Sequence, residues 1–133
     1  TICQKKGEKI SLLGHSQGGL VAVSLAQKNS HLVDKVIALG TPFKGTKMAY
    51  LQYPVKSCRQ MLPGNIFLQE LSERGYPKNI NFYSVISRYD HIVPWRNALL
   101  PPYKNVTNII VNDCGHASLI RKHELIGEIL KEG

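Results

Sequence analysis

The sequence predicts an α/β fold in which a mostly parallel sheet is flanked by helices. Short apolar runs alternate along the chain with segments of helical pattern, and this alternation is typical of parallel strands joined by right-handed crossovers. Most of the apolar runs are continuous rather than alternating, as expected for strands whose two sheet faces are both covered. The length of 133 residues allows one ordinary domain and excludes two.

Four segments are expected to form the strands of this sheet. Each is a short run rich in apolar residues, bounded by Gly, Asn, Asp or Ser, which commonly end strands. The four predicted strands are Lys9–Gly14, Lys35–Gly40, Ile80–Ile86 and Val106–Val111.

Three helices are expected between and after these strands. The first, Gly19–Lys28, is apolar nearly all round and is predicted to be buried. The second covers about Asn65–Arg74, and the third, Ser118–Lys131, is amphipathic and is predicted to lie on the outer surface. The intervening stretch Thr41–Lys78 contains four prolines and is too long for a simple loop, so part of it is expected to form a flap or an insertion.

Composition narrows the function without assigning it. The net charge is +8, yet the basic residues are dispersed and match no nucleic-acid module, so a nucleic-acid partner is not predicted. The charge is interpreted as a solvated surface, and the alternative is a weak attraction toward anionic lipid or substrate surfaces. No apolar run approaches the roughly 18–20 residues of a membrane helix. The chain opens at Thr1 without an initiating Met, so the sequence does not assign a compartment.

Cysteine usage suggests neither disulfides nor a metal site. The three cysteines Cys3, Cys58 and Cys114 are odd in number, widely spaced and without a C-x-x-C pair. We therefore expect free thiols.

The motif that carries chemistry is GHSQGG at residues 14–19, where a predicted strand meets a predicted helix. In that context the G-x-S-x-G pattern predicts a strained turn that lifts the hydroxyl of Ser16 above the sheet. Gly14 and Gly18 are expected to remove bulk on either side of the turn, and Gly19 to bring the helix close. The backbone N–H of Gln17 is then expected to face an oxyanion. The alternative interpretation is a glycine-rich turn with a capping serine.

A serine hydroxyl needs a base, and among the five histidines we predict His116 for that role. It lies after the last predicted strand and before the last helix, and sites of this kind assemble at the carboxyl ends of parallel strands. His15 is fixed in the turn beside Ser16 and is not expected to face its hydroxyl. The alternative for His116 is a loop histidine with local hydrogen bonds. The remaining histidines occupy less suitable positions, namely His31, His91 and His123.

For the acid that orients this base, the sequence favours Asp90. It follows the predicted strand Ile80–Ile86, and the nearby Pro94 is expected to stiffen its loop. The rival is Asp113, whose separation of three residues from His116 also suits a local turn. The resulting order of serine, aspartate and histidine is the one expected for this type of nucleophile turn.

Several segments in addition to GHSQGG resemble the C-terminal half of an α/β-hydrolase, specifically a lipase or esterase. The similar segments are LGTPFKGT at 39–46, MLPGNIFL at 61–68, RYDHIVP at 88–94 and DCGHA at 113–117. The resemblance implies a three-layer α/β-hydrolase-type sheet and hydrolysis of carboxylic esters through an acyl-serine. It implies Ser16, Asp90 and His116 as catalytic residues, Gln17 in the oxyanion hole, an ester or lipid small molecule as substrate, and no cofactor or metal.

The sequence departs from this family before the nucleophile strand. The family places further strands there, together with a loop that donates a second oxyanion N–H, and no residue here matches that loop. We therefore hypothesise that residues 1–133 are the C-terminal portion of a single α/β-hydrolase domain and that the fold is incomplete. A thioesterase, acyltransferase or amidase would use the same triad. A truncated, non-catalytic binding protein of the same fold is the alternative from another class.

Overall fold

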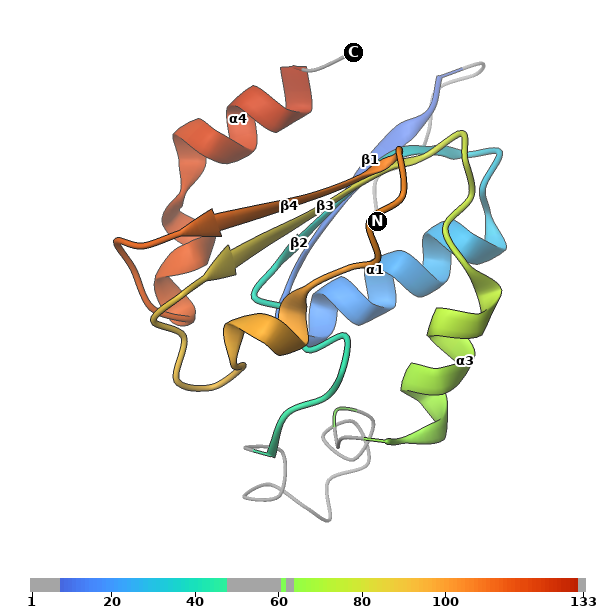
Figure 1. Ribbon diagram of the computed structural model, residues 1–133. Helices are drawn as coiled ribbons and strands as arrows, with labels where there is room; N and C mark the ends of the chain where they lie inside the picture. The colour runs from blue at the N-terminus through green and yellow to red at the C-terminus, as the bar shows by residue number, and fades with distance from the viewer. Residues whose placement is uncertain (1–7, 48–60, 62–63, 132–133) are drawn as a thin grey trace.

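A parallel sheet forms the centre of the protein (Figure 1). The computed structural model describes residues 8–47, 61 and 64–131. Within these residues the sheet has four strands in the order β1-β2-β3-β4, all parallel. They are β1 (Ile10–His15), β2 (Val33–Leu39), β3 (Asn81–Ser87) and β4 (Val106–Val111). The prediction of an α/β fold with a parallel sheet is confirmed, and each strand lies within two residues of its expected bounds.

Helices connect the strands and cover the sheet. The helix α1 (Gln17–Lys28) joins β1 to β2, and α3 (Ile66–Arg74) precedes β3. The Asn65 side chain caps α3 by accepting a hydrogen bond of 2.8 Å from the backbone N–H of Phe67. The remaining helical elements are η2 (Trp95–Ala98), η3 (Ala117–Arg121) and α4 (His123–Lys131).

The single helix predicted over Ser118–Lys131 is wrong, because the structure divides it. The 3-10 helix η3 ends at Arg121, and the following residue, Lys122, has a φ of −76° and a ψ of 57°, which are not helical. The helix α4 begins at His123. The Lys122 backbone N–H donates to the carbonyl of Leu119, and its ammonium group bonds Asp113 at 2.5 Å. This side-chain contact lies outside the helix, so apolar periodicity could not reveal the break.

The two sheet faces are covered by different helices, with α1 and α3 on one side and α4 on the other (Figure 1). Alternate residues of the central strands supply the two cores. Val36 and Phe82 pack with α1 and α3, whereas their neighbours Ile37 and Tyr83 pack with η3 and α4. Strands buried on both faces favour consecutive apolar residues, as in the run from Val36 to Leu39 that completes β2.

Lys35 is a buried charged residue within β2, and it joins the sheet to α4. Its side chain is 4% exposed, and its ammonium group donates to the carbonyl of Ile129 at 2.7 Å and to that of Leu130 at 3.3 Å. The last carbonyls of a helix lack intrahelical partners and carry partial negative charge. Lys35 therefore satisfies the carboxyl end of α4 and fixes it against β2.

The proposed flap or insertion at Thr41–Lys78 is only partly visible. Residues 48–60 and 62–63 lie outside the described residues, so the structure does not test this expectation there. At the two ends of the segment, residues 41–47 follow β2 and α3 occupies the later part.

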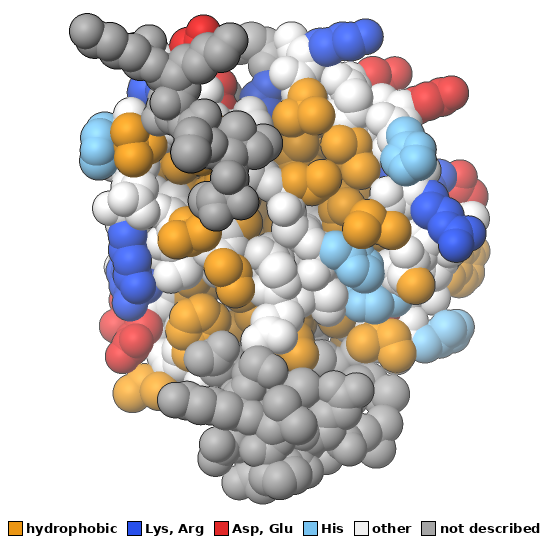
Figure 2. All heavy atoms as spheres, turned by 180° about the vertical axis from the view of Figure 1, so that it is seen from behind, with side chains coloured by type: hydrophobic (Ala, Val, Ile, Leu, Met, Phe, Trp, Pro, Cys, Tyr) orange, Lys and Arg blue, Asp and Glu red, His pale blue; other side chains and the backbone are white. Residues whose placement is uncertain are grey.

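Large apolar side chains reach the surface on β1, on α1 and just before β2. Leu13, Val21, Leu25 and Leu32 are each at least 40% exposed. Figure 2, which views the molecule from behind relative to Figure 1, shows hydrophobic side chains at the surface. Within the described residues β1 pairs only with β2, so it is an edge strand of this part of the sheet. No helix in this part of the chain has the length and apolar character that a membrane span requires.

Tyr76, which follows α3, is an ionisable group held in an apolar setting. Its ring contacts Phe82 edge-on at 5.1 Å between centroids, and the Tyr103 ring lies 6.1 Å away. Burial, together with the nearby Tyr103, raises the pKa of Tyr76 to about 12.

This raised pKa predicts an alkaline loss of stability that Tyr76→Phe removes. Tyrosine in the unfolded chain ionises near pH 10, and Tyr76 in the folded protein ionises near pH 12. Between these pH values the folded state keeps the phenol proton that the unfolded state loses, so the free energy of unfolding decreases as the pH rises. The full difference corresponds to at most roughly 3 kcal/mol. Urea unfolding at about pH 9 and about pH 11 should show a smaller decrease for Tyr76→Phe than for wild type. Equal decreases in the two proteins would contradict the assignment.

Candidate active site

Ser16 lies in a strained turn between β1 and α1. Its φ of 55° and ψ of −121° make it the one residue other than glycine with a positive φ among those described. Its backbone N–H donates to the carbonyl of Leu39 at 2.7 Å, and its carbonyl accepts from Gly19 at 3.0 Å. A conformation of this kind costs about 1–3 kcal/mol and persists only where the surroundings enforce it. The strained turn expected from GHSQGG is therefore present.

Of the three glycines around the turn, Gly14 and Gly19 have the roles predicted for them and Gly18 does not. A Cβ on Gly14 would lie 2.3 Å from the carbonyl carbon and oxygen of Gly18, and one on Gly19 would lie 1.9 Å from Thr41 Oγ1. A Cβ on Gly18 would meet nothing within 4 Å. The close approach thus depends on Gly14 and Gly19, and the expectation that Gly18 must itself lack bulk is wrong. Gly18 contributes its main chain, which fills the space that a side chain on Gly14 would need.

This difference gives a paired prediction for two substitutions four residues apart. Gly14→Ala is expected to destabilise the protein by about 1–3 kcal/mol, because the new methyl group meets backbone that cannot turn aside. Gly18→Ala should be neutral or stabilise by up to about 1 kcal/mol, since it adds a methyl group to a helix in open space. Urea unfolding of both variants measures the contrast. A larger loss from Gly18→Ala would contradict this account of the turn.

Asp90 and His116 form the closest polar pair of the site. Asp90 Oδ2 lies 2.6 Å from His116 Nδ1, and the two side chains are 1% and 13% exposed. The other carboxylate oxygen of Asp90 accepts backbone N–H groups from Ile92 and Val93, each at 2.8 Å. These bonds fix the carboxylate, which accepts the Nδ1 proton of His116 and leaves Nε2 with a lone pair. The structure therefore brings the predicted acid and the predicted base together.

The rival acid, Asp113, points elsewhere. Its side chain is 68% exposed and pairs with Lys122 at 2.5 Å. The hydrogen bond from Lys122 lowers the pKa of Asp113 and raises that of Lys122. Asp113 thus acts as a surface partner of the η3–α4 junction.

Gly40 connects the nucleophile turn with the acid–base pair. It follows Leu39, the residue to which Ser16 is bonded, and has a φ of 57°. A Cβ on Gly40 would lie 3.0 Å from His116 Nδ1 and 3.3 Å from Asp90 Oδ2. The end of β2 therefore supports both parts of the site. Ser16 Oγ and His116 form no hydrogen bond in the described structure, which is common before substrate binds.

The sequence predicts no role for Gly40, and it predicts that His15 does not act as the base for Ser16. The signal for Gly40 was its position directly after a buried strand, next to the strand that carries Ser16. His15 was expected to be fixed in the turn, and its Nε2 does lie 2.9 Å from the backbone carbonyl of His116. That contact joins residues 101 positions apart, so no local pattern could reveal it.

Gln17, the predicted oxyanion donor, is the first residue of α1. Backbone N–H groups in the first turn of a helix point out of its end and favour negative charge there. The helix α1 begins two residues before the predicted start at Gly19, which places Gln17 in its first turn. The role of Gln17 in binding an oxyanion stays a prediction.

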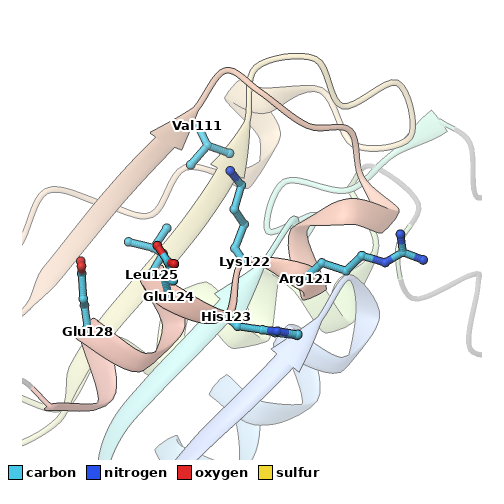
Figure 3. Close-up of a pocket in the computed structure, with 7 residues that line it drawn as sticks. All are labelled: Val111, Arg121, Lys122, His123, Glu124, Leu125 and Glu128. Atoms are coloured by element: carbon cyan, nitrogen blue, oxygen red, sulfur yellow. The ribbon is translucent and has the colours of Figure 1, made fainter.

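Three cavities of the described structure lie away from these residues. A cavity of about 540 Å³ lies beside the end of β4, where Lys122 points toward Val111 while Arg121 points away from it (Figure 3). A second of about 350 Å³ lies between Phe43 and α3, and a third of about 610 Å³ adjoins Tyr76. Neither Ser16, Asp90 nor His116 lines any of the three.

In residues 8–47, 61 and 64–131, no group of three or more His, Cys, Asp or Glu side chains is placed to hold a metal ion.

Comparison with known proteins identifies the fold. A family model described as the alpha/beta hydrolase fold matches residues 3–61. No curated protein matches the chain. Among solved structures, the mature lipase BlEst2 of Bacillus licheniformis is 20% identical, with a TM-score of 0.74 over 93% of this chain and 65% of that one. The monoacylglycerol lipase of Paleococcus ferrophilus is 14% identical, with a TM-score of 0.64 over 92% and 68%.

The similar structures are not all lipases. The meta-cleavage product hydrolase CumD of Pseudomonas fluorescens is 15% identical, with a TM-score of 0.59 over 92% of this chain and 63% of that one. The chain therefore spans about two thirds of the length of these three proteins. The predicted resemblance is confirmed: the chain has the α/β-hydrolase fold that is also found in these lipases.

Proposed function

We propose that the protein is a serine hydrolase that cleaves carboxylic esters, as a lipase or a carboxylesterase, through an acyl-serine intermediate. The observation that carries this proposal is the bond of 2.6 Å between Asp90 and His116 beside the strained turn of Ser16. A buried aspartate that orients a histidine next to a serine is the arrangement that activates a hydroxyl group as a nucleophile.

In the proposed reaction, His116 Nε2 takes the proton of Ser16 Oγ as that oxygen attacks the ester carbonyl carbon. The backbone N–H of Gln17 donates to the oxyanion that forms. The negative charge of Asp90 stabilises the resulting imidazolium ion, which gives its proton to the departing alcohol. A water molecule, deprotonated by His116, then attacks the acyl group and releases the carboxylic acid, and Ser16 recovers its proton.

The substrate class is proposed as a small-molecule ester or lipid, because two of the similar structures are named as a lipase and a monoacylglycerol lipase. The same triad would also serve a thioesterase, an acyltransferase or an amidase. The net charge of +8 supports a weak attraction to anionic lipid surfaces, which long-range electrostatics would provide.

Hydrolysis of short-chain p-nitrophenyl esters tests the proposal. We expect turnover that depends on Ser16, measured on the 133-residue chain and on an N-terminally extended chain. Rates on a matched thioester and a matched anilide show which bond is preferred. Covalent labelling by a fluorophosphonate reports Ser16 independently of the substrate. A folded extended chain in which Ser16 neither labels nor supports turnover would contradict the proposal and favour a binding protein.

The same assay compares the activity of the 133-residue chain with that of the extended chain. Equal, Ser16-dependent turnover by the 133-residue and extended chains would contradict the hypothesis that the fold is incomplete. If a second oxyanion donor is supplied by the extension, its absence alone should lower kcat by roughly 10²–10³-fold.

A further inference from the structure

We propose that His15 is a positioning residue, which holds the loop carrying His116 in register with Ser16. Its effect on turnover rests on the proposed function, whereas its effect on the geometry of the Asp90–His116 pair does not. His15 takes no part in proton transfer in this proposal. It acts through the main chain of the base.

The contact between the two histidines is direct. His15 Nε2 lies 2.9 Å from the backbone carbonyl oxygen of His116. The two imidazole rings are 4.8 Å apart between centroids, with an angle of 40° between their planes. Because a carbonyl oxygen only accepts, His15 Nε2 carries the proton and donates it. The side chain before the nucleophile thus holds the backbone of the base.

No other bond of comparable length holds this carbonyl among the described residues. The backbone N–H of Leu119 also donates to the carbonyl of His116, but at 3.4 Å, near the limit for a hydrogen bond. His116 is the residue before η3 and has helical dihedral angles, so its carbonyl begins that short helix. A donor from β1 therefore fixes the point at which η3 starts.

The His116 loop is then held at three places that do different work. Asp90 holds one ring nitrogen of His116, and the hydroxyl of Ser87 donates to the carbonyl of Cys114. Neither contact determines how far the imidazole lies from Ser16, because both come from β3 and the loop after it. His15 is the last residue of β1 and is joined covalently to Ser16. The contact from His15 therefore sets the distance between the imidazole of His116 and the hydroxyl of Ser16.

Three variants separate positioning from simple structural support. His15→Phe keeps an aromatic ring but removes the donor. His15→Gln places an amide N–H close to the position of Nε2. His15→Asn has the same amide chemistry on a side chain one carbon shorter, which does not reach the carbonyl of His116. If His15→Phe fails to fold, the Gln and Asn pair still tests the proposal.

The expected kinetic result is a loss of kcat with little change in KM. Displacement of a catalytic group by about 1 Å can cost on the order of 10²-fold, so we expect His15→Phe and His15→Asn to lose about tenfold to hundredfold. His15→Gln should recover most of kcat. A residue with only a structural role would instead lower kcat in proportion to the loss of folded protein, which urea unfolding measures.

A spectroscopic measurement tests the geometry without any substrate. The Nδ1 proton between His116 and Asp90 should give a far-downfield proton NMR signal. We expect His15→Phe and His15→Asn to shift or broaden this signal, and His15→Gln to preserve it. If the wild-type signal is present but esters are not hydrolysed, the proposed function fails while the role of His15 is still tested. An unchanged signal in folded His15→Phe and His15→Asn would overturn the inference, as would unchanged kcat in an active enzyme.

Discussion

Replacing Ser16 with Ala is expected to lower kcat for ester hydrolysis by at least about 10⁴-fold, because it removes the only atom proposed to attack the carbonyl carbon. The fold should survive the change. The bonds that hold the turn come from the backbone of Ser16, whose N–H donates to Leu39 and whose carbonyl accepts from Gly19. Initial rates on p-nitrophenyl esters, with urea unfolding of the same preparation, measure both effects.

A matched control is available on the preceding strand. Ser11 lies in β1 and donates its hydroxyl proton to Asp34 in an exposed hydrogen bond of 3.0 Å. Ser11→Ala should leave kcat within about twofold of wild type, since exposed bonds of this kind contribute little. Turnover that survives Ser16→Ala, or that falls equally in Ser11→Ala, would show that Ser16 is not the nucleophile.

Replacing Asp90 with Asn is expected to lower kcat by about 10⁴-fold while leaving the loop in place. In the orientation that keeps the amide oxygen toward Ile92 and Val93, that oxygen still accepts their N–H groups. The amide nitrogen then faces His116 Nδ1 and donates to it. This forces the imidazole proton onto Nε2, which leaves no lone pair to deprotonate Ser16. The fall in kcat should therefore exceed any fall in stability.

The neighbouring aspartate provides the comparison for this variant. Asp113→Asn changes the same chemical group close to the same histidine in sequence, but Asp113 is exposed and bonded to Lys122. It should lose little activity, within about twofold, because an exposed ion pair contributes little. If Asp113→Asn proved the more damaging substitution, the assignment of the acid would pass to Asp113.

Much of the fold could be predicted because it follows from burial. The strands β2 and β3 are covered on both faces, and both carry apolar residues at adjacent positions, such as Val36 and Ile37 in β2 and Val85 and Ile86 in β3, which indicates this burial. The carboxyl ends of parallel strands meet at one edge of a sheet, so the loops after β3 and β4 were expected to meet as well. Asp90 and His116 lie in those loops, and the structure bonds them to each other.

What could not be predicted depends on contacts between distant main-chain and side-chain atoms. The chain leaves the helical conformation at Lys122, whose side chain bonds Asp113, and helical periodicity reveals neither feature. His15 reaches the carbonyl of a residue 101 positions away. A Cβ has no room at Gly14 but has open space at Gly18, because the start of α1 lies against Gly14. The motif presents the two glycines as equivalent.

The glycine at position 40 has a consequence for the design of new hydrolases. It offers no reactive atom, yet a single methyl group there would press against both members of the acid–base pair. Searches that rank positions by chemical functionality pass over such a residue. A designer who grafts a serine, an aspartate and a histidine onto another scaffold should therefore also place a glycine where the backbone contacts the acid–base pair.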